Sequence, residues 1–319
     1  MAAIEVPPSW AEALDRIVSS GGCYLVLGGT DTGKSTFCRL AVERLRTAGK
    51  VPALVDGDIG QSQFGVPGTI FGLRWGGPQS KEQQTLATFF VGAVSPRGAA
   101  LQCLAGICRV TSVLRAARSD ALLVDTTGYI RGPAAVELKQ AKVAALQPAA
   151  IVLIQRGREA ETIVQAGPCA DDQVWRLECP AAVAVRSREQ RRERRRAKFA
   201  RYFSKASAYL LGLAEKRICT GGLPAFEMWL PREGLPLTDA DRAALFQQAL
   251  LRYPGLLVGL RDARTQLRGL GLLTVLEASG GRAEIFSPVG PDEFETIQLG
   301  LMTLNRSGEE TARVEVFGE

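Results

Sequence analysis

The sequence contains no histidine, and this absence excludes several classes of active site. A Ser-His-Asp or Cys-His relay, an imidazole-ligated zinc ion and a histidine pH switch all need a residue that the chain does not have. We therefore expect a carboxylate to serve as the general base of any enzyme built on this sequence.

Cysteine pairs and long apolar runs are also missing. The seven cysteines form no CxxC pair and are odd in number, which argues against a disulfide framework or a cysteine metal site. We interpret them as small buried hydrophobic residues in a reducing compartment. No apolar run approaches the roughly 18 residues of a membrane span. The first ten residues lack the basic start and apolar centre of a signal peptide. The sequence thus predicts a cytoplasmic protein without membrane contact.

Lysine is scarce, because only eight of the 39 basic residues are lysine and 31 are arginine. Arginine binds phosphate groups with two parallel hydrogen bonds. Residues 186–201 hold nine basic and two acidic residues, a local charge of +7 in a chain whose net charge is +6. The rest of the chain therefore sums to −1. This segment lacks glycine and proline, so we expect it to form a helix.

The 319 residues suffice for one large domain and a smaller one, and the 46% of hydrophobic residues can fill a sizeable core. From residue 21 to about 180, short apolar runs alternate with longer helical patterns. This alternation predicts an α/β fold, with a mostly parallel sheet flanked by helices. The expected strands are 23–27, 51–56, 85–94, 121–125 and 149–154, and the expected helices are 34–48, 100–118 and 134–147.

The pattern changes after about residue 206. Thr238 and Asp241 resemble a capping box that opens a helix reaching about Tyr253. From about residue 255 the pattern is of strands, and an apolar run, the Gly280-Gly281 turn and a second run predict a hairpin. We expect a small β-rich C-terminal domain.

Residues 28–35 read GGTDTGKS and fit the phosphate-loop pattern GxxxxGK[ST], between an expected strand and an expected helix. In such a loop, backbone N–H groups and the helix N-terminus surround the phosphates. Lys34 reaches the β and γ oxygens, Ser35 ligates Mg²⁺, and Thr36 adds a hydroxyl near the α-phosphate. The motif predicts nucleoside triphosphate binding but does not identify the phosphoryl acceptor. The residues expected to hold the nucleotide are Gly28, Gly29, Thr30, Asp31, Thr32, Gly33, Lys34, Ser35 and Thr36.

Two further strand ends carry polar residues. Asp56, Asp58 and Gln61 follow the second expected strand, which we expect to neighbour the phosphate loop. A carboxylate there takes a proton from an attacking hydroxyl or holds Mg²⁺, whereas Asp56 could simply form a turn. Asp125 opens a DxxG sequence in which the aspartate approaches Mg²⁺ and the N–H of Gly128 approaches the γ-phosphate.

Tyr129 follows the DxxG sequence at once and either stacks on a base or belongs to the core. The arginine segment allows three interpretations: a solvated helix, a patch for nucleic acid or an acidic partner, or a catalytic lid whose arginine accelerates phosphoryl transfer. Arg188, Arg192 and Arg195 would share one helical face. The candidate lid residues are Arg186, Arg191, Arg192 and Arg195.

Together these segments resemble a known family, the polynucleotide 5′-hydroxyl kinases related to the kinase subunit of the eukaryotic mRNA cleavage factor and to the pre-ribosomal-RNA processing kinases. The resemblance spans about residues 21–203 and covers the later part of the chain only loosely. The matching segments, in the family's order, are GGTDTGKST, DGDIGQSQFGVPGT, FFVGAVSPRG, DTTGYIRG with ELKQAKVAALQPAAIVLI, and RSREQRRERRRAKFARYF.

The resemblance implies a role for each matching residue. Lys34 and Ser35 would hold ATP and Mg²⁺, and Asp58 would activate the 5′-hydroxyl. The resemblance further assigns Gln61 to metal or substrate, Thr126 and Gly128 to the γ-phosphate region, Tyr129 to the terminal nucleotide, Arg186 and Arg191 to the lid, and Ser95 and Arg97 to a substrate clasp.

The sequence departs from the family in two ways. Family members often carry tryptophan where Tyr129 stands, so we expect base stacking that is weaker or differently oriented. Only about 20 residues precede the first expected strand, so we expect the protein to lack the N-terminal domain of other members. This favours a free-standing enzyme without an obligate protein partner.

We therefore predict an ATP-dependent kinase that phosphorylates the 5′-hydroxyl ends of RNA, DNA or both. The alternatives are a nucleotide-binding regulatory or scaffold protein and a kinase for a small metabolite. The expected organisation is an extension over 1–20, a phosphate-loop kinase domain over 21–205 with its lid at 186–203, and a C-terminal domain over 206–319. The residues predicted to be catalytic are Asp58, Lys34, Arg191 and Arg186. We expect Arg195 to contact the nucleotide and Arg192 to contact the substrate. The predicted metal ligands are Ser35, Asp58 and Asp125.

Overall fold

The computed structural model describes residues 6–76, 82–165, 167–212, 215–220, 223–224, 248, 250–277 and 281–314. The chain divides into two compact units. The first comprises residues 1–65, 69–89 and 95–188, and the second comprises residues 66–68, 90–94 and 189–319. Two short segments of the second unit thus lie within the sequence of the first.

A seven-stranded sheet forms the first unit, in the order β4-β3-β2-β5-β1-β6-β7. β1, β2, β5, β6 and β7 pair in parallel, whereas β3 runs antiparallel to β2. The mostly parallel sheet is therefore confirmed. The strands are β1 (Gly22–Gly28), β2 (Pro52–Gly57), β3 (Thr69–Trp75), β4 (Gln83–Phe90), β5 (Ala121–Thr126), β6 (Ala150–Gln155) and β7 (Val174–Glu178). The expected strand over 85–94 ends at Phe90, and β3 and β7 were not predicted.

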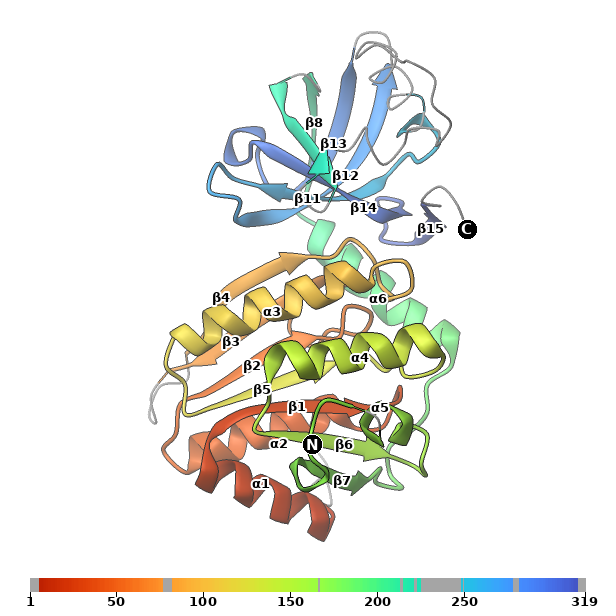
Figure 1. Cartoon of the computed structure of the whole chain (residues 1–319). Helices are drawn as coiled ribbons and strands as arrows, with labels where there is room; N and C mark the ends of the chain where they lie inside the picture. The colour runs from red at the N-terminus through yellow and green to blue at the C-terminus, as the bar shows by residue number, and fades with distance from the viewer. Residues whose placement is uncertain are drawn as a thin grey trace. The chain divides into compact units, whose positions relative to one another are not determined.

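Helices cover both faces of this sheet (Figure 1). They are α1 (Pro8–Ser20), α2 (Lys34–Thr47), α3 (Ala100–Ala116), α4 (Pro133–Leu146) and the short α5 (Glu161–Gln165). Because both faces are covered, the central strands are buried along nearly their whole length, which explains their continuous apolar sequences.

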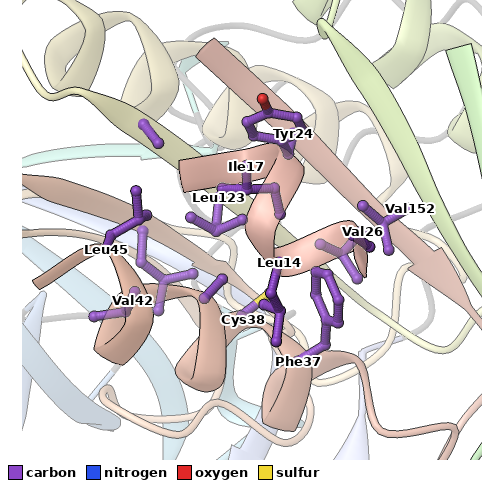
Figure 2. Packing of buried hydrophobic residues seen from close by; sticks show 14 of the residues in the cluster. Leu14, Ile17, Tyr24, Val26, Phe37, Cys38, Val42, Leu45, Leu123 and Val152 are labelled. Carbon is purple, nitrogen blue, oxygen red and sulfur yellow. The ribbon is translucent and has the colours of Figure 1, made fainter. Parts of the chain in front are cut away.

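α1 and α2 share one hydrophobic cluster with the sheet (Figure 2). Leu14 and Ile17 of α1 meet Phe37 and Cys38 of α2 over the strand side chains. The indole of Trp10 packs edge-on against Phe37, and its N–H donates to the Glu178 carbonyl at 3.0 Å. The predicted N-terminal extension thus contains a helix that belongs to the core.

The second unit contains an eight-stranded sheet in the order β10-β9-β14-β11-β12-β13-β8, with β15 paired to β14. The predicted hairpin is confirmed, because β12 and β13 pair antiparallel. The predicted capping box at Thr238 and Asp241 lies outside the described residues. The strands are β8 (Ser207–Gly212), β9 (Arg217–Thr220), β10 (Leu223–Pro224), β11 (Leu256–Arg261), β12 (Leu267–Glu277), β13 (Arg282–Ser287), β14 (Thr296–Leu304) and β15 (Glu310–Arg313).

The arginine segment forms the helix α6 (Arg188–Phe203), as its composition predicts. Its buried side chains, Phe199 and Phe203, pack with Leu270 and Met302 in a cluster of the second unit. The Tyr202 hydroxyl accepts a hydrogen bond from the Leu270 N–H at 2.7 Å. α6 is therefore tied to the second sheet through one face. Among the described residues, no helix is long and apolar enough to cross a membrane.

Candidate functional site

Three neighbouring parallel strands end at one edge of the first sheet, and each carries one of the polar motifs. The phosphate loop follows β1, and β5 lies between β1 and β2. The motif that follows β2 is therefore separated from the phosphate loop by one strand. The sequence placed β2 beside the loop, and this detail was wrong. Asp56 and Asp125 are register partners on β2 and β5. The carboxyl edge of a parallel sheet is where such folds bind their ligands.

The phosphate loop is closely packed against its surroundings. Gly28 and Gly33 adopt φ values of 151° and 93°, and a Cβ on Gly28 would lie 2.1 Å from the Ile154 carbonyl oxygen. Lys34 is buried and its Nζ donates to the Gly29 carbonyl at 2.5 Å. Since α2 begins at Lys34, its unpaired N-terminal N–H groups line the loop. This geometry suits the binding of phosphate groups.

The DxxG sequence after β5 lies directly against this loop. A Cβ on Gly128 would lie 2.5 Å from the backbone nitrogen of Thr30, so only glycine fits there. The Thr30 hydroxyl also donates to the Gly128 carbonyl at 3.5 Å. The structure therefore brings Gly128 to the phosphate loop.

Asp125 lies beneath the loop and is the best placed carboxylate for a metal ion. It is buried and lies near the Ser35 hydroxyl, which lowers its pKa, while its Oδ1 has no hydrogen-bond partner among the described residues. Burial is the main cause that raises the pKa of Asp125 to about 7. The Lys34 ammonium lowers this pKa, and the Asp56 and Asp58 carboxylates raise it.

A hydroxyl beside a carboxylate with an unused oxygen fits Mg²⁺, which is commonly held by one or two carboxylates, waters and substrate phosphates. In the part of the chain that the structure describes, no group of three or more carboxylates or thiols could hold a metal on its own. Ser35 and Asp125 would therefore hold Mg²⁺ together with the nucleotide rather than in a closed protein site.

The raised pKa of Asp125 predicts a pH dependence of folding stability. The folded-state pKa of about 7 exceeds the ordinary value of 3.8, so ionisation of this carboxyl opposes folding. Its stabilising contribution is complete at acid pH and is lost as the pH rises through about 7. Asp125→Asn cannot ionise. In denaturant unfolding without nucleotide, we expect the variant to gain stability relative to the wild type as the pH rises from about 4 to about 7, and the difference to stay constant above that.

Asp15→Asn provides the control, because Asp15 is an exposed residue paired with Arg44 at 2.8 Å. This variant should keep the wild-type pH trend. A constant difference between Asp125→Asn and the wild type across the same pH range would contradict a titration at Asp125.

The two carboxylates after β2 have different surroundings. Asp56 is buried, and its Oδ2 accepts hydrogen bonds from the Ser62 hydroxyl at 2.8 Å and from the backbone N–H groups of Gln63 and Phe64 at 2.8 and 3.0 Å. Burial raises the pKa of Asp56. Asp56 therefore folds the following turn and has no oxygen facing solvent.

Asp58 is half-buried at the end of the strand. Its Oδ1 accepts hydrogen bonds from the N–H groups of Gly60 and Gln61, both at 3.1 Å. These two bonds form an Asx turn that fixes the carboxylate. Its Oδ2 accepts no hydrogen bond from another described residue. One oxygen of Asp58 is thus anchored and the other is available to a substrate.

A pair of buried lysines on α4 supports these motifs, and the sequence reasoning missed it. Lys139 is completely buried, and its Nζ donates to the Thr126 hydroxyl at 2.9 Å and to the Thr127 carbonyl at 2.6 Å. Burial lowers the pKa of Lys139 well below its ordinary value. Lys142 is also buried, and its Nζ has no hydrogen-bond partner among the described residues. The signal available in the sequence was two lysines three positions apart on a helix whose other polar residues are Glu137 and Gln140.

The resemblance assigned Thr126 to the γ-phosphate region, and the structure places its hydroxyl inside the protein. The side chain is buried, accepts from Lys139 and donates to the Val26 carbonyl at 2.9 Å. Thr126 therefore joins β5 to β1 and to α4.

The predicted lid residues separate into two groups. Arg186 binds Asp31 of the phosphate loop through its guanidinium at 2.9 Å. Within the second unit, Arg192 donates to the Glu310 carbonyl at 2.7 Å and Arg195 forms an ion pair with the Glu310 carboxylate. The structure thus brings Arg186 to the site and engages Arg192 and Arg195 with β15. The roles proposed for these residues stay predictions.

The remaining predicted residues differ in their exposure and in their local contacts. Arg191 of α6 is half-buried, as are Gln61 and Tyr129, and the Gln61 amide donates to the Gly60 carbonyl at 2.8 Å. The Ser95 hydroxyl accepts a hydrogen bond from the Arg97 N–H at 3.3 Å, in the turn before α3. Arg97 is exposed.

Comparisons with known proteins agree with this geometry. Residues 28–205 match the model of the family described as mRNA cleavage and polyadenylation factor CLP1 P-loop. A polyribonucleotide 5′-hydroxyl-kinase of Pyrococcus horikoshii is 28% identical, over 96% of this chain and 93% of its own length. A protein of the same description from Methanocaldococcus jannaschii is 26% identical over 96% and 94%.

One solved structure, of a wild-type Clp1p-Pcf11p complex, shares the fold with a TM-score of 0.65 at 14% identity. The similarity covers 92% of this chain and 77% of that one.

Proposed function

The chain belongs to the mRNA cleavage and polyadenylation factor CLP1 P-loop family, and from this premise we propose that it is an ATP-dependent polynucleotide 5′-hydroxyl kinase. One observation carries the proposal: Asp58 presents an unengaged carboxylate oxygen at the sheet edge that also holds the phosphate loop and the Ser35–Asp125 pair. The names of the archaeal relatives, which cover nearly the whole chain, support it.

In the proposed mechanism, the phosphate loop and Lys34 bind the triphosphate of ATP. Mg²⁺, held by Ser35 and Asp125 with the phosphates, would offset negative charge on the phosphate oxygens. Asp58 takes the proton of the 5′-hydroxyl while the hydroxyl oxygen attacks the γ-phosphorus. The bond from the γ-phosphorus to the bridging oxygen breaks, and ADP leaves. Arg186 stabilises the charge that spreads over the transferred group.

RNA is the acceptor that we propose, because the relatives are named for polyribonucleotides. The test is transfer of labelled γ-phosphate from ATP to matched oligonucleotides: 5′-hydroxyl RNA, 5′-hydroxyl DNA and their 5′-phosphorylated forms. We expect label on hydroxyl ends only, with RNA preferred. Binding of ATP without label on any oligonucleotide would instead favour a regulatory nucleotide-binding protein. Label on free nucleosides alone would favour a small-metabolite kinase.

Two exposed arginines of α6 predict how oligonucleotide binding depends on salt concentration. Arg194 and Arg201 are seven residues apart and therefore share one face of the helix, and both are exposed. Neither forms an ion pair with another described residue, whereas Arg196 pairs with Glu193 at 2.7 Å. We expect Arg194→Gln with Arg201→Gln to raise KM for a long oligonucleotide. The slope of log KM against log salt should fall by about 0.7 for each lost phosphate contact.

Arg196→Gln is the matched control on the same helix, because its guanidinium is already engaged with Glu193. This variant should leave the salt slope unchanged. A loss of slope per removed charge that is equal in both variants would show that α6 attracts the strand through its total charge rather than through these two residues.

A further inference from the structure

An acidic residue stands in the middle of the phosphate loop. Asp31 has a side chain only 5% exposed and a left-handed backbone with φ of 55°. For a residue other than glycine, such a conformation is strained and persists where the surroundings enforce it. A carboxylate here also repels the phosphates that the loop binds. The backbone strain and the repulsion of phosphates both indicate that another residue interacts with the Asp31 carboxylate.

That partner is Arg186, which lies 155 positions later in the chain. The Arg186 guanidinium donates to Asp31 Oδ1 at 2.9 Å, and the Arg186 backbone N–H donates to Asp31 Oδ2 at 3.0 Å. Both oxygens of one carboxylate therefore hold one residue by its main chain and its side chain. These two hydrogen bonds fix the orientation of the Arg186 side chain as well as its position.

A second arginine also binds Asp31, through its backbone carbonyl. Arg156, which directly follows β6, donates from Nη2 to the Asp31 carbonyl and to the Val183 carbonyl, both at 3.0 Å. The loop and the segment that leads to Arg186 are thereby joined by two arginines. All of these residues belong to the first unit.

A guanidinium has five N–H donors, so one that binds a carboxylate can bind a phosphate oxygen at the same time. Its charge also cancels the negative charge that Asp31 adds to the loop. We infer that Asp31 is a positioning residue that anchors Arg186 at the phosphate loop, so that the guanidinium acts on the transferred phosphoryl group. The inference rests on the proposed kinase function and adds the residue that aims its lid arginine.

The test is a double-mutant cycle on Asp31→Asn and Arg186→Gln. Asparagine keeps an acceptor for the Arg186 N–H but removes the charge. We expect Asp31→Asn to lower kcat by about 10-fold with little change in KM for ATP. Arg186→Gln should lower kcat by at least about 10³-fold. In the Arg186→Gln background, Asp31→Asn should cause no further loss, because its effect runs through that arginine.

Asp15→Asn is the matched control, since it breaks an exposed aspartate–arginine pair of similar length in the same unit. It should leave both kcat and KM unchanged. If Asp31 merely shaped the loop, Asp31→Asn would raise KM for ATP and would cost the same factor with or without Arg186. That result would overturn the inference.

Hydrogen exchange of the Arg186 amide separates this inference from the proposed function. The bond to Asp31 Oδ2 predicts slow exchange in the wild type and fast exchange in Asp31→Ala. Phosphoryl transfer by a wild type whose Arg186 amide is unprotected would overturn the anchoring alone. Protection without any transfer to a 5′-hydroxyl would overturn the kinase function, and the role of Asp31 in it.

Discussion

Asp58→Asn is expected to lower kcat for phosphoryl transfer by about 10²- to 10⁴-fold, which is the usual contribution of a general base. The physical reason is that the two carboxylate oxygens of Asp58 have different roles: one accepts the hydrogen bonds of the turn and the other is available to the substrate. Asparagine keeps an oxygen that can accept from the N–H groups of Gly60 and Gln61, so the turn is preserved. The second position becomes an amide that cannot take a proton from the 5′-hydroxyl. Single-turnover transfer to a 5′-hydroxyl oligonucleotide measures the loss.

Asp56→Asn is the matched control for this prediction. Asp56 lies on the same strand, yet the residue is only 2% exposed and its Oδ2 is engaged with the following turn, so it cannot reach an acceptor. We expect Asp56→Asn to keep most of the transfer activity, and Asp58→Asn to keep its melting temperature. An equal loss of transfer in both variants would assign the effect to the charge of the strand end, not to a base.

Lys34→Met is the second large effect that we expect. The ammonium of Lys34 is the principal cation of the phosphate loop, and the loss of one such preorganised donor costs about 10²- to 10³-fold in kcat. Lys34 is also the nearby charge that most lowers the pKa of Asp125. Its removal therefore makes the neutral form of Asp125 more favourable and weakens the proposed metal site as well. Transfer and ATP binding should both fall.

Lys50→Met serves as the control, because Lys50 follows α2 and forms no ion pair with another described residue. It should bind ATP and transfer phosphate as the wild type does. Normal transfer by Lys34→Met would contradict the assignment of this loop to the nucleotide.

The elements that the sequence predicts well are those with strong local signals. The central strands are buried on both faces and therefore read as continuous apolar runs, and the phosphate loop has a spacing that few other structures share. β7 was missed because VWRLE is short and carries two charges. α1 was treated as an extension, although Trp10, Ala13, Leu14 and Ile17 have helical spacing.

The contacts that build the site were less accessible to prediction, because they join residues far apart in the chain. Asp31 and Arg186 are 155 positions apart, and Arg195 and Glu310 are 115 apart. Charge alone made all arginines of 186–201 equivalent. Their division between the phosphate loop and β15 depends on where the other carboxylates lie in space. The same holds for Lys139, whose partners are oxygens of another element.

The two segments of the second unit that are inserted in the first have a practical consequence for dissecting this protein. The chain passes from one unit to the other at five points, after residues 65, 68, 89, 94 and 188. Gly92 accepts a hydrogen bond from the Leu301 N–H at 2.8 Å, and a Cβ on Gly259 would lie 2.7 Å from the Phe90 ring. Any fragment that stops before β8 leaves these residues without their covering strands. No single cut yields two intact modules, so point variants in the full chain are the sound way to assign function to either half.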